Sequence, residues 1–214
     1  IIFRASASVR VSLAPGAVSP EVTAMKKRII MGITGASGAP LAVELLRKIR
    51  TIPDAESHVI CSRSGALTLR QECGMELEEL RRLSHVWYDN GDIGAAVASG
   101  SFRTLGMAVV PCSMKTLAGI VTGYSDSLLL RAADVVLKER RRLVLVPREC
   151  PLSTLHLRNL TAASELGAVI VPPVPAYYQH PKCIDDINGR ISAKVLALFG
   201  LDTGAIPEWG GLDL

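Results

Sequence analysis

A glycine-rich turn near the start of the chain is the first segment whose residue types indicate chemistry. Gly32, Gly35 and Gly38 are spaced three residues apart, with Ser37 among them. Glycines allow close approach of a ligand to the main chain, and a helix beginning here would favour a phosphate. No lysine follows Gly38, which excludes a Walker loop, and Thr34 replaces the second glycine of the dinucleotide fingerprint. The segment is either a phosphate-binding turn or a tight connection without a ligand.

Three later segments place polar side chains directly after apolar runs. Residues 61–63, Cys-Ser-Arg, contain no acid to bind a dinucleotide ribose, which favours a mononucleotide such as FMN. Residues 113–116 could hold the polar edge or phosphate of a flavin, or Ser113 could simply cap a helix. Arg148 could bind a phosphate bidentately and Glu149 could transfer a proton, unless the two form a structural ion pair.

The remaining candidates are aromatic, thiol or imidazole side chains. Tyr177 and Tyr178 follow a proline-rich segment in a chain with only 4% aromatic residues, and they either line a site or pack in the core. Cys112 has no nearby sequence partner to activate it, which indicates a buried thiol. The four histidines lack metal-ligand spacing, so no metal site is predicted.

Apolar runs alternating with helical patterns must position these residues. Strands are predicted at 28–33, 58–61, 107–111, 143–147 and 168–171, and helices after Pro40 and at 66–69 with 76–83, 114–121, 126–139 and 152–166, with Gly167 as a C-cap. Strands that are apolar throughout indicate a parallel sheet covered on both faces. The expected fold is a single doubly wound, Rossmann-like (flavodoxin-like) α/β domain, with ligands outside the carboxyl ends of its strands.

Composition bounds the function. The 214 residues are 49% hydrophobic and 21% charged, which is typical of one folded domain. No apolar run reaches the roughly 18 residues of a membrane span. A net charge of +4 is too small to indicate nucleic-acid binding, and five scattered cysteines indicate a reducing, cytoplasmic location. Residues 1–24 are interpreted as a flexible leader, a transit segment or an added tail, and 25–214 as the domain.

Seven motifs together resemble the UbiX/Pad family of flavin prenyltransferases, in order and in spacing. They are residues 34–38, 98–101, 111–118, 131–140, 145–149, 151–156 and 175–178. The resemblance extends from Met25 to about Leu212. Residues 99–104 and 112–116 look most like the members of this family that accompany hydroxyarylic-acid decarboxylases.

The resemblance implies a metal-independent transfer of a dimethylallyl group from dimethylallyl monophosphate to N5 and C6 of reduced FMN. The product, prenylated FMN, would serve a UbiD-type decarboxylase. The family forms dodecamers with sites at subunit contacts. Whether the donor of this chain is a mono- or a diphosphate stays open.

Site residues follow from the same resemblance. The residues expected to contact FMN are Gly35, Ala36, Ser37, Ser62, Ser113, Met114, Lys115, Thr116 and Arg148. Those expected to hold the prenyl phosphate are Lys138, Arg148 and Tyr178, with Ser37 nearby and Arg131 supporting them. One position departs from the family, because Lys194 stands where arginine is usual and lacks the bidentate fork of a guanidinium.

The chemistry suits these side chains. Cations would stabilise the departing phosphate, and Tyr178 and Trp209 would shelter the allylic cation. Ring closure at C6 requires loss of a proton, for which Glu149 is the first candidate and Glu72 the second, unless the phosphate shares that work.

Two alternatives stay open beside the transferase. One is a non-catalytic FMN-binding subunit of an aromatic acid decarboxylase. The other, less favoured, is a flavin-dependent cysteine decarboxylase, whose usual motifs are absent here. Decarboxylation by this chain alone is not expected.

Overall fold

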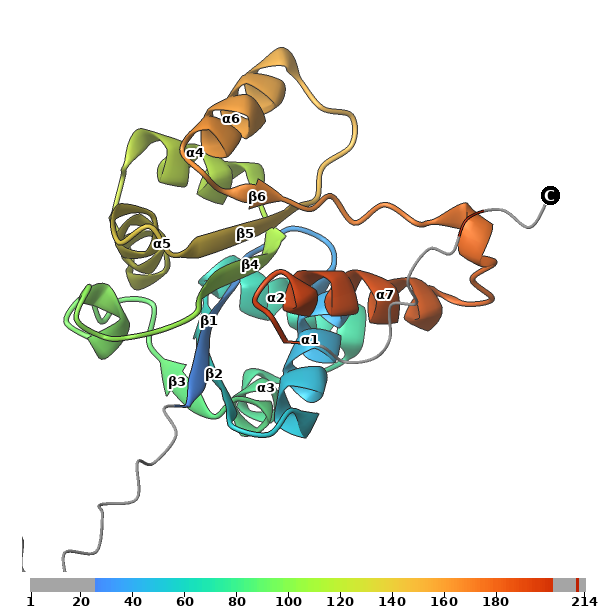
Figure 1. Ribbon diagram of the computed structural model, residues 1–214, viewed down its shortest axis with the longest axis horizontal. Coiled ribbons are helices and arrows are strands. Elements are labelled where there is room, and N and C mark those ends of the chain that lie inside the picture. The colour runs from blue at the N-terminus through green and yellow to red at the C-terminus, as the bar shows by residue number, and fades with distance from the viewer. Residues whose placement is uncertain (1–25, 202–210, 212–214) are drawn as a thin grey trace, which may run out of the picture.

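Six parallel strands form the centre of the molecule (Figure 1). The computed structural model describes residues 26–201 and residue 211. The strands are β1 (Lys27–Ile33), β2 (Ala55–Cys61), β3 (Val86–Tyr88), β4 (Gly106–Cys112), β5 (Arg142–Pro147) and β6 (Val169–Ile170). The middle strands are buried almost throughout, as expected for a sheet covered on both faces.

The strand order is β3-β2-β1-β4-β5-β6, and every neighbouring pair is parallel. This is the Rossmann order, and without the three-residue edge strand β3 it is also the flavodoxin-like order. The predicted doubly wound fold is therefore confirmed. The direction of winding reverses between β1 and β4, and ligands of such sheets bind outside the carboxyl ends of the strands at this point.

Two layers of helices cover the sheet. Side chains alternate along each strand, so that Ile29 and Met31 face one core cluster and Ile30 faces the other. The first cluster takes residues from α1 (Ala39–Thr51), α2 (Arg63–Cys73), α3 (Leu77–Leu83) and α7 (Ile184–Ala197). The second takes residues from α4 (Met114–Thr122), α5 (Leu128–Lys138) and α6 (Thr154–Glu165). Two 3₁₀ turns, η1 (Ala96–Ala98) and η2 (Tyr177–Gln179), interrupt the longer connections.

The five predicted strands are present, and their ends differ by only a few residues. Strand β3 was not predicted, because three half-buried residues carry too short a pattern. The single helix predicted from residues 66–69 with 76–83 is two helices, α2 and α3. Ser62 caps the start of α2 and left-handed Gly74 ends it, and a capping box at Glu76 begins α3. Gly167, with a φ of 97°, follows α6 as expected.

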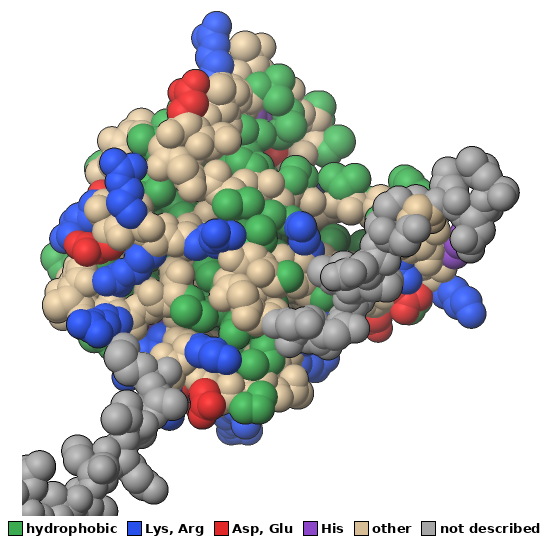
Figure 2. All heavy atoms as spheres, in the orientation of Figure 1, with side chains coloured by type: hydrophobic (Ala, Val, Ile, Leu, Met, Phe, Trp, Pro, Cys, Tyr) green, Lys and Arg blue, Asp and Glu red, His purple; other side chains and the backbone are tan. Residues whose placement is uncertain are grey.

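Several features of the described residues bear on function class. No helix among them is long and apolar enough to cross a membrane. The five cysteines are all free thiols. On the face in Figure 2, Lys and Arg side chains are distributed over several elements, with acidic and hydrophobic side chains between them.

Some predictions fall outside the described residues. The leader assigned to residues 1–24, the domain boundary at Met25 and the position of Trp209 all lie there. These three stay predictions.

Candidate active site

One buried hydroxyl joins the carboxyl ends of the two strands where the winding reverses. Thr34, directly after β1, donates from Oγ1 to the Pro111 carbonyl of β4 at 2.7 Å. The same oxygen accepts from the N–H of Ser113 at 2.8 Å. Thr34 is only 1% exposed, so neither bond competes with water. In the sequence, Thr34 stood out only because it replaces a glycine of the dinucleotide fingerprint. In the structure it fixes the distance between the carboxyl ends of β1 and β4.

The glycine-rich turn after β1 packs tightly against α2. A Cβ added to Gly35 would lie 2.3 Å from Cβ of Ser64, in the first turn of α2, so no larger residue fits without movement. Gly38 has a φ of 123°, which side-chain-bearing residues rarely adopt. Ala36 is buried and Ser37 is half-buried. Main chain is therefore presented at the carboxyl edge with little side-chain cover.

The N-terminus of α1 is occupied by a carboxylate of the same chain. Glu72 Oε2, from α2, accepts from the N–H groups of Gly38 and Ala39, both at 2.8 Å. Burial raises the pKa of Glu72, but hydrogen bonds from Ser37, Gly38 and Ala39 and the charge of Arg148 together lower it below its usual value. The phosphate expected at this helix start would therefore have to displace Glu72 from these two groups.

The starts of α2 and α4 are capped by serines. Ser62 accepts from the N–H of Gly65 at 3.0 Å, and Ser113 accepts from the N–H of Thr116 at 3.3 Å. The capping interpretation of Ser113 is thus confirmed, and its hydroxyl also donates to Thr116 Oγ1 at 3.1 Å. Helix geometry leaves the N–H groups of Met114 and Lys115 without an intrahelical acceptor, so they face the crevice as donors.

The thiol beside this turn is inert. Burial raises the pKa of Cys112 to about 12, so its nucleophilic thiolate form is absent near neutral pH. The sequence interpretation of Cys112 as a buried thiol is confirmed, since it is fully buried.

Arg148 and Glu149 extend from the carboxyl end of β5 into solvent. The N–H of Arg148 donates to the Cys112 carbonyl at 3.2 Å, which ties this end to β4. Its guanidinium lies close enough to Glu72 to lower the pKa of that carboxyl. Glu149 Oε1 accepts from the N–H of Cys150 at 3.1 Å. No ion pair joins Arg148 to Glu149 in the described chain, so the alternative of a structural pair is not supported.

Lys138 lies near the opposite end of the strands, before the amino end of β5. It ends α5, just before β5 begins, and its ammonium pairs with Glu139 beside Gly100. Arg141 holds the neighbouring loop by donating to the carbonyls of Phe102 and Gly100. Arg131, earlier on α5, pairs with Asp134 at 2.7 Å.

A single chain therefore does not bring all the predicted phosphate ligands together. The six residues of β5 separate Lys138 from Arg148, which at about 3.3 Å per residue is roughly 20 Å. Ser37, Glu72 and Arg148 are brought together, whereas Lys138 and Arg131 are not part of that group.

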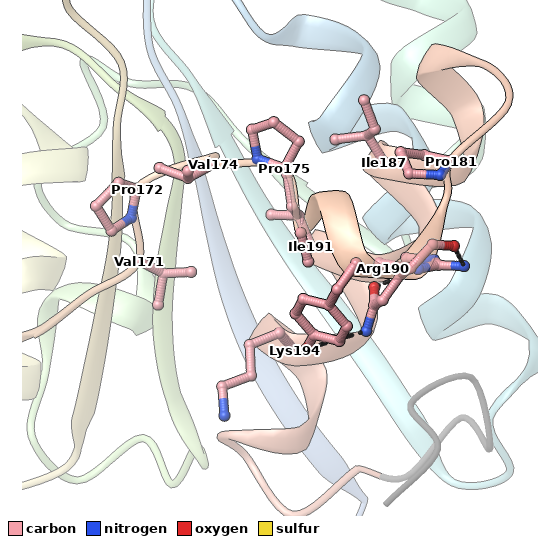
Figure 3. Close-up of a pocket in the computed structure, with 12 residues that line it drawn as sticks. Val171, Pro172, Val174, Pro175, Pro181, Ile187, Arg190, Ile191 and Lys194 are labelled. Atoms are coloured by element: carbon pink, nitrogen blue, oxygen red, sulfur yellow. Dashed lines mark hydrogen bonds between the residues drawn. The ribbon is translucent and has the colours of Figure 1, made fainter. Parts of the chain in front are cut away.

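Tyr178 and Lys194 meet in a different place, a cavity of about 330 Å³ between the 171–181 segment and α7 (Figure 3). Its lining is mainly apolar, from Val171, Pro172, Val174, Pro175, Ile187 and Ile191. Two polar lining residues were not predicted, Gln179 and Arg190. The signal for Arg190 was its position one helical turn before Lys194, which places both on one face of α7.

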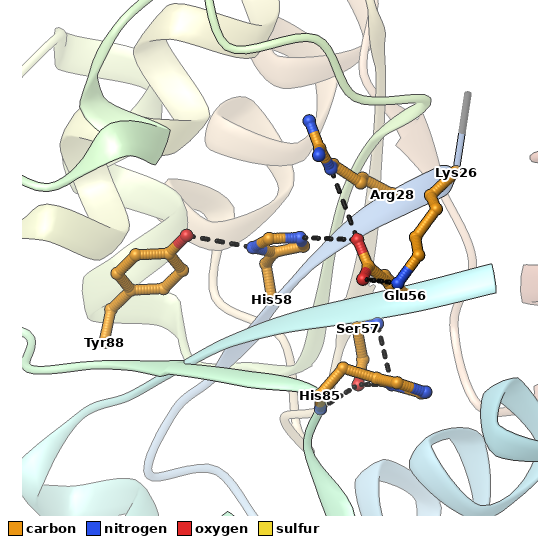
Figure 4. A network of polar contacts seen from close by, with 7 residues as sticks. All are labelled: Lys26, Arg28, Glu56, Ser57, His58, His85 and Tyr88. Carbon is orange, nitrogen blue, oxygen red and sulfur yellow. Dashed lines mark hydrogen bonds and ion pairs between the residues drawn. The ribbon is translucent and has the colours of Figure 1, made fainter. Parts of the chain in front are cut away.

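A further polar cluster lies along β2, away from the crevice (Figure 4). Glu56 accepts from Lys26 and Arg28, and it lies 3.8 Å from the ring of His58. The other ring nitrogen of His58 is 2.9 Å from the Tyr88 hydroxyl. Burial lowers the pKa of His58 to about 4, so the imidazole is neutral near pH 7.

Comparison with known proteins places the chain among flavoproteins. The model of the family described as Flavoprotein matches residues 17–194. The flavin prenyltransferase UbiX of Escherichia coli (strain K12) is 51% identical over 182 residues, which cover 85% of this chain and 95% of that protein.

Two solved structures have the same fold at high identity. A dodecameric FMN-dependent UbiX-like decarboxylase from Escherichia coli O157:H7 is 49% identical, with a TM-score of 0.84 over 86% of this chain and 100% of that one. AnUbiX (PadA1), in complex with FMN and dimethylallyl pyrophosphate, is 45% identical, with a TM-score of 0.85 over 88% of this chain and 100% of that one.

Proposed function

The chain belongs to the flavoprotein family, among its UbiX-like flavin prenyltransferases, and from this premise we propose which of its residues perform the reaction. The enzyme transfers a dimethylallyl group from dimethylallyl monophosphate to N5 and C6 of reduced FMN, without a metal. The product serves a UbiD-type decarboxylase. The crevice between β1 and β4, with Arg148 at its edge, is the observation that carries the assignment of the site.

The residues of the crevice fit FMN. The glycine turn presents main chain without side-chain cover, and the free N–H groups of Met114 and Lys115 suit a phosphate or the polar edge of a flavin. Arg148 adds a cation, and Ser37, Ser62 and Thr116 add hydroxyls. When bound, reduced FMN supplies the nucleophilic atoms that accept the prenyl group.

The cavity beside α7 fits the donor. Its apolar lining suits a five-carbon chain, and Tyr178 and Lys194 suit the phosphate at one end. Cationic donors stabilise a departing phosphate more than the neutral ester, which assists cleavage of its C–O bond. The aromatic ring of Tyr178 has a face that stabilises a nearby cation.

Lys138 reaches a phosphate only from another copy. In its own chain it is roughly 20 Å from Arg148, along the length of β5. We infer that in a dodecamer, the assembly of the UbiX-like relative, the α5 end of one subunit lies at the donor cavity of the next. The proposed donor site therefore forms only on assembly, with Arg131 supporting α5.

Glu149 is the better candidate for the base. It is exposed and accepts one hydrogen bond, from Cys150. Glu72 is held anionic by α1 and Ser37, which makes it a poor proton acceptor and gives it the role of fixing the turn. Ring closure at C6 would release its proton to Glu149.

The decisive experiment is incubation of the protein with reduced FMN and dimethylallyl monophosphate, followed by mass spectrometry of the flavin. We expect a flavin heavier by one prenyl group, and recovery of unmodified FMN alone would contradict the function. Replacement Glu149→Gln should slow the reaction roughly 100-fold or more. The matched control, Glu165→Gln on the exposed end of α6, should not change the rate.

The same variant tests the non-catalytic alternative. A simple FMN carrier would still support its decarboxylase after Glu149→Gln, whereas the transferase would not. Release of carbon dioxide from an aromatic acid by the purified chain alone is not expected. A cytoplasmic location is part of the proposal and is supported by five free cysteines.

A further inference from the structure

Arg190 joins α7 to the turn that carries Tyr178. Its guanidinium donates to two oxygens of Gln179, the side-chain Oε1 and the main-chain carbonyl, the latter at 3.1 Å. Gln179 is the last residue of η2, and His180 after it has a φ of 49°. The turn therefore has little regular structure of its own, and the half-buried Arg190 clamp holds it to α7 (Figure 3).

This clamp also determines which way the amide of Gln179 points. A guanidinium has only donors, so the amide oxygen must face Arg190 and the amide nitrogen must face away from it. That nitrogen, Nε2, lies 3.4 Å from the hydroxyl oxygen of Tyr178 and donates to it. The Tyr178 oxygen is thus an acceptor toward Gln179, and its own proton is directed to a different acceptor. A phosphate oxygen is an acceptor of this kind.

We propose that Arg190 is a positioning residue that orients the Tyr178 hydroxyl as a donor to the phosphate of the prenyl substrate. The proposal rests on the proposed function and adds to it a residue outside the set predicted from the sequence. Arg190 and Lys194 line the same cavity one turn apart, so the cation that binds and the cation that orients lie on one face of α7.

Two substitutions separate orientation from charge. Arg190→Met removes the clamp, and Gln179→Glu keeps an acceptor for Arg190 but removes the donor to Tyr178. In the second variant the Tyr178 proton is drawn to the new carboxylate instead of to the phosphate. Arg82→Met, on the exposed face of α3, is the matched control for loss of one positive charge.

The experiment is calorimetric titration of dimethylallyl monophosphate into the full-length assembled protein loaded with FMN. We expect both variants to raise the donor Kd roughly tenfold, with FMN affinity unchanged and the Arg82→Met variant like wild type. A double-mutant cycle with Tyr178→Phe supplies the readout that a merely structural role would not move. Once the hydroxyl is gone, Arg190→Met and Gln179→Glu should weaken binding by less than about twofold more.

Two results would overturn the assignment. One is a donor Kd like that of wild type in both variants. The other is an effect that adds in full to that of Tyr178→Phe. A wild-type protein that binds FMN but no donor would overturn the proposed function, and the role of Arg190 with it. That outcome can be told apart from the other two, because in it the protein without substitutions already fails to bind the donor.

Discussion

The crevice at β1 and β4 and the cavity at α7 are built in opposite ways. In the crevice, buried Thr34 bonds to both strand ends, and Glu72 occupies the start of α1. In the cavity, Tyr178 is 65% exposed and Lys194 is also exposed, and the clamp from Arg190 to Gln179 holds the turn. The crevice proposed for FMN is therefore held by bonds within one chain, whereas the cavity proposed for the donor has few internal restraints.

This difference indicates how the two ligands are bound. Groups fixed by a packed core are preorganised and bind without further ordering, whereas exposed side chains lose rotamer freedom when a ligand holds them. Binding of the donor should consequently depend on FMN and on neighbouring subunits. Because coupling between two binding sites is reciprocal, the donor should strengthen the binding of FMN by the same factor.

Gly35→Ala should have the largest effect, a loss of FMN binding in the crevice. The added Cβ would meet Cβ of Ser64 at 2.3 Å, so the turn or α2 must move. We expect FMN affinity to fall roughly 100-fold, measured by quenching of flavin fluorescence. Gly189→Ala in α7 is the control, because nothing lies within 4 Å of the new atom. Equal FMN affinity in the two variants would contradict the close packing of this turn.

Thr34→Val tests the bond between the strand ends. Valine keeps the shape but leaves the Pro111 carbonyl and the Ser113 N–H without their partner. The free energy of unfolding should fall by about 2 kcal/mol in urea titrations. Thr122→Val, which removes a hydroxyl bonded only within α4 at the surface, should lower it by much less. A similar loss of stability in both variants would mean that the two bonds of Thr34 between the strand ends contribute no more than a surface hydroxyl does.

Acid should lower the stability of the sheet that supports the crevice. The pKa of His58 is lowered from 6.5 to about 4, so the unfolded chain binds more protons between these values. The stabilisation is complete above pH 6.5 and is lost as the pH falls toward 4. We expect a loss of about 2 kcal/mol at pH 4.5 relative to pH 7. Glu56, Arg28, His85 and Tyr88 lie around this ring and contribute to the profile.

The measurement is urea unfolding at both pH values for wild type and for His58→Gln. The variant should lose less stability on acidification than wild type. His180→Asn, at an exposed position with a φ of 49° that asparagine tolerates, should behave like wild type. Identical pH profiles for wild type and His58→Gln would exclude the imidazole as the source.

Lys194→Arg should have the smallest effect, a modest gain in the affinity of the cavity for the donor. A guanidinium can bind a phosphate through two parallel hydrogen bonds, which an ammonium cannot do. We expect the donor Kd to decrease about threefold, with FMN affinity unchanged. Lys182→Arg, outside the cavity lining, is the control. Weaker binding of the prenyl donor by the Lys194→Arg variant would indicate that Arg190 already occupies the space that a second guanidinium needs.

Patterns among residues close in sequence predicted most of the strands and helices and part of the candidate site. The apolar runs of β1 and β4 and the serine cap of α4 depend on residues close in sequence, so they could be recognised directly. Strand β3 and the clamp at Arg190 could not. A three-residue edge strand has too short a pattern, and a side-chain bond across a loop leaves no periodic signal.

The sequence by itself determined the parallel α/β sheet and the polar residues at its strand ends, because both follow from short-range periodicity and turn chemistry. The tertiary structure decided which of those residues meet. Glu72 caps α1 from 34 residues away, and Lys138 and Arg148 lie at opposite ends of β5 although they are close in sequence. Such contacts depend on how helices pack on the sheet, since a strand between two residues separates them by its whole length.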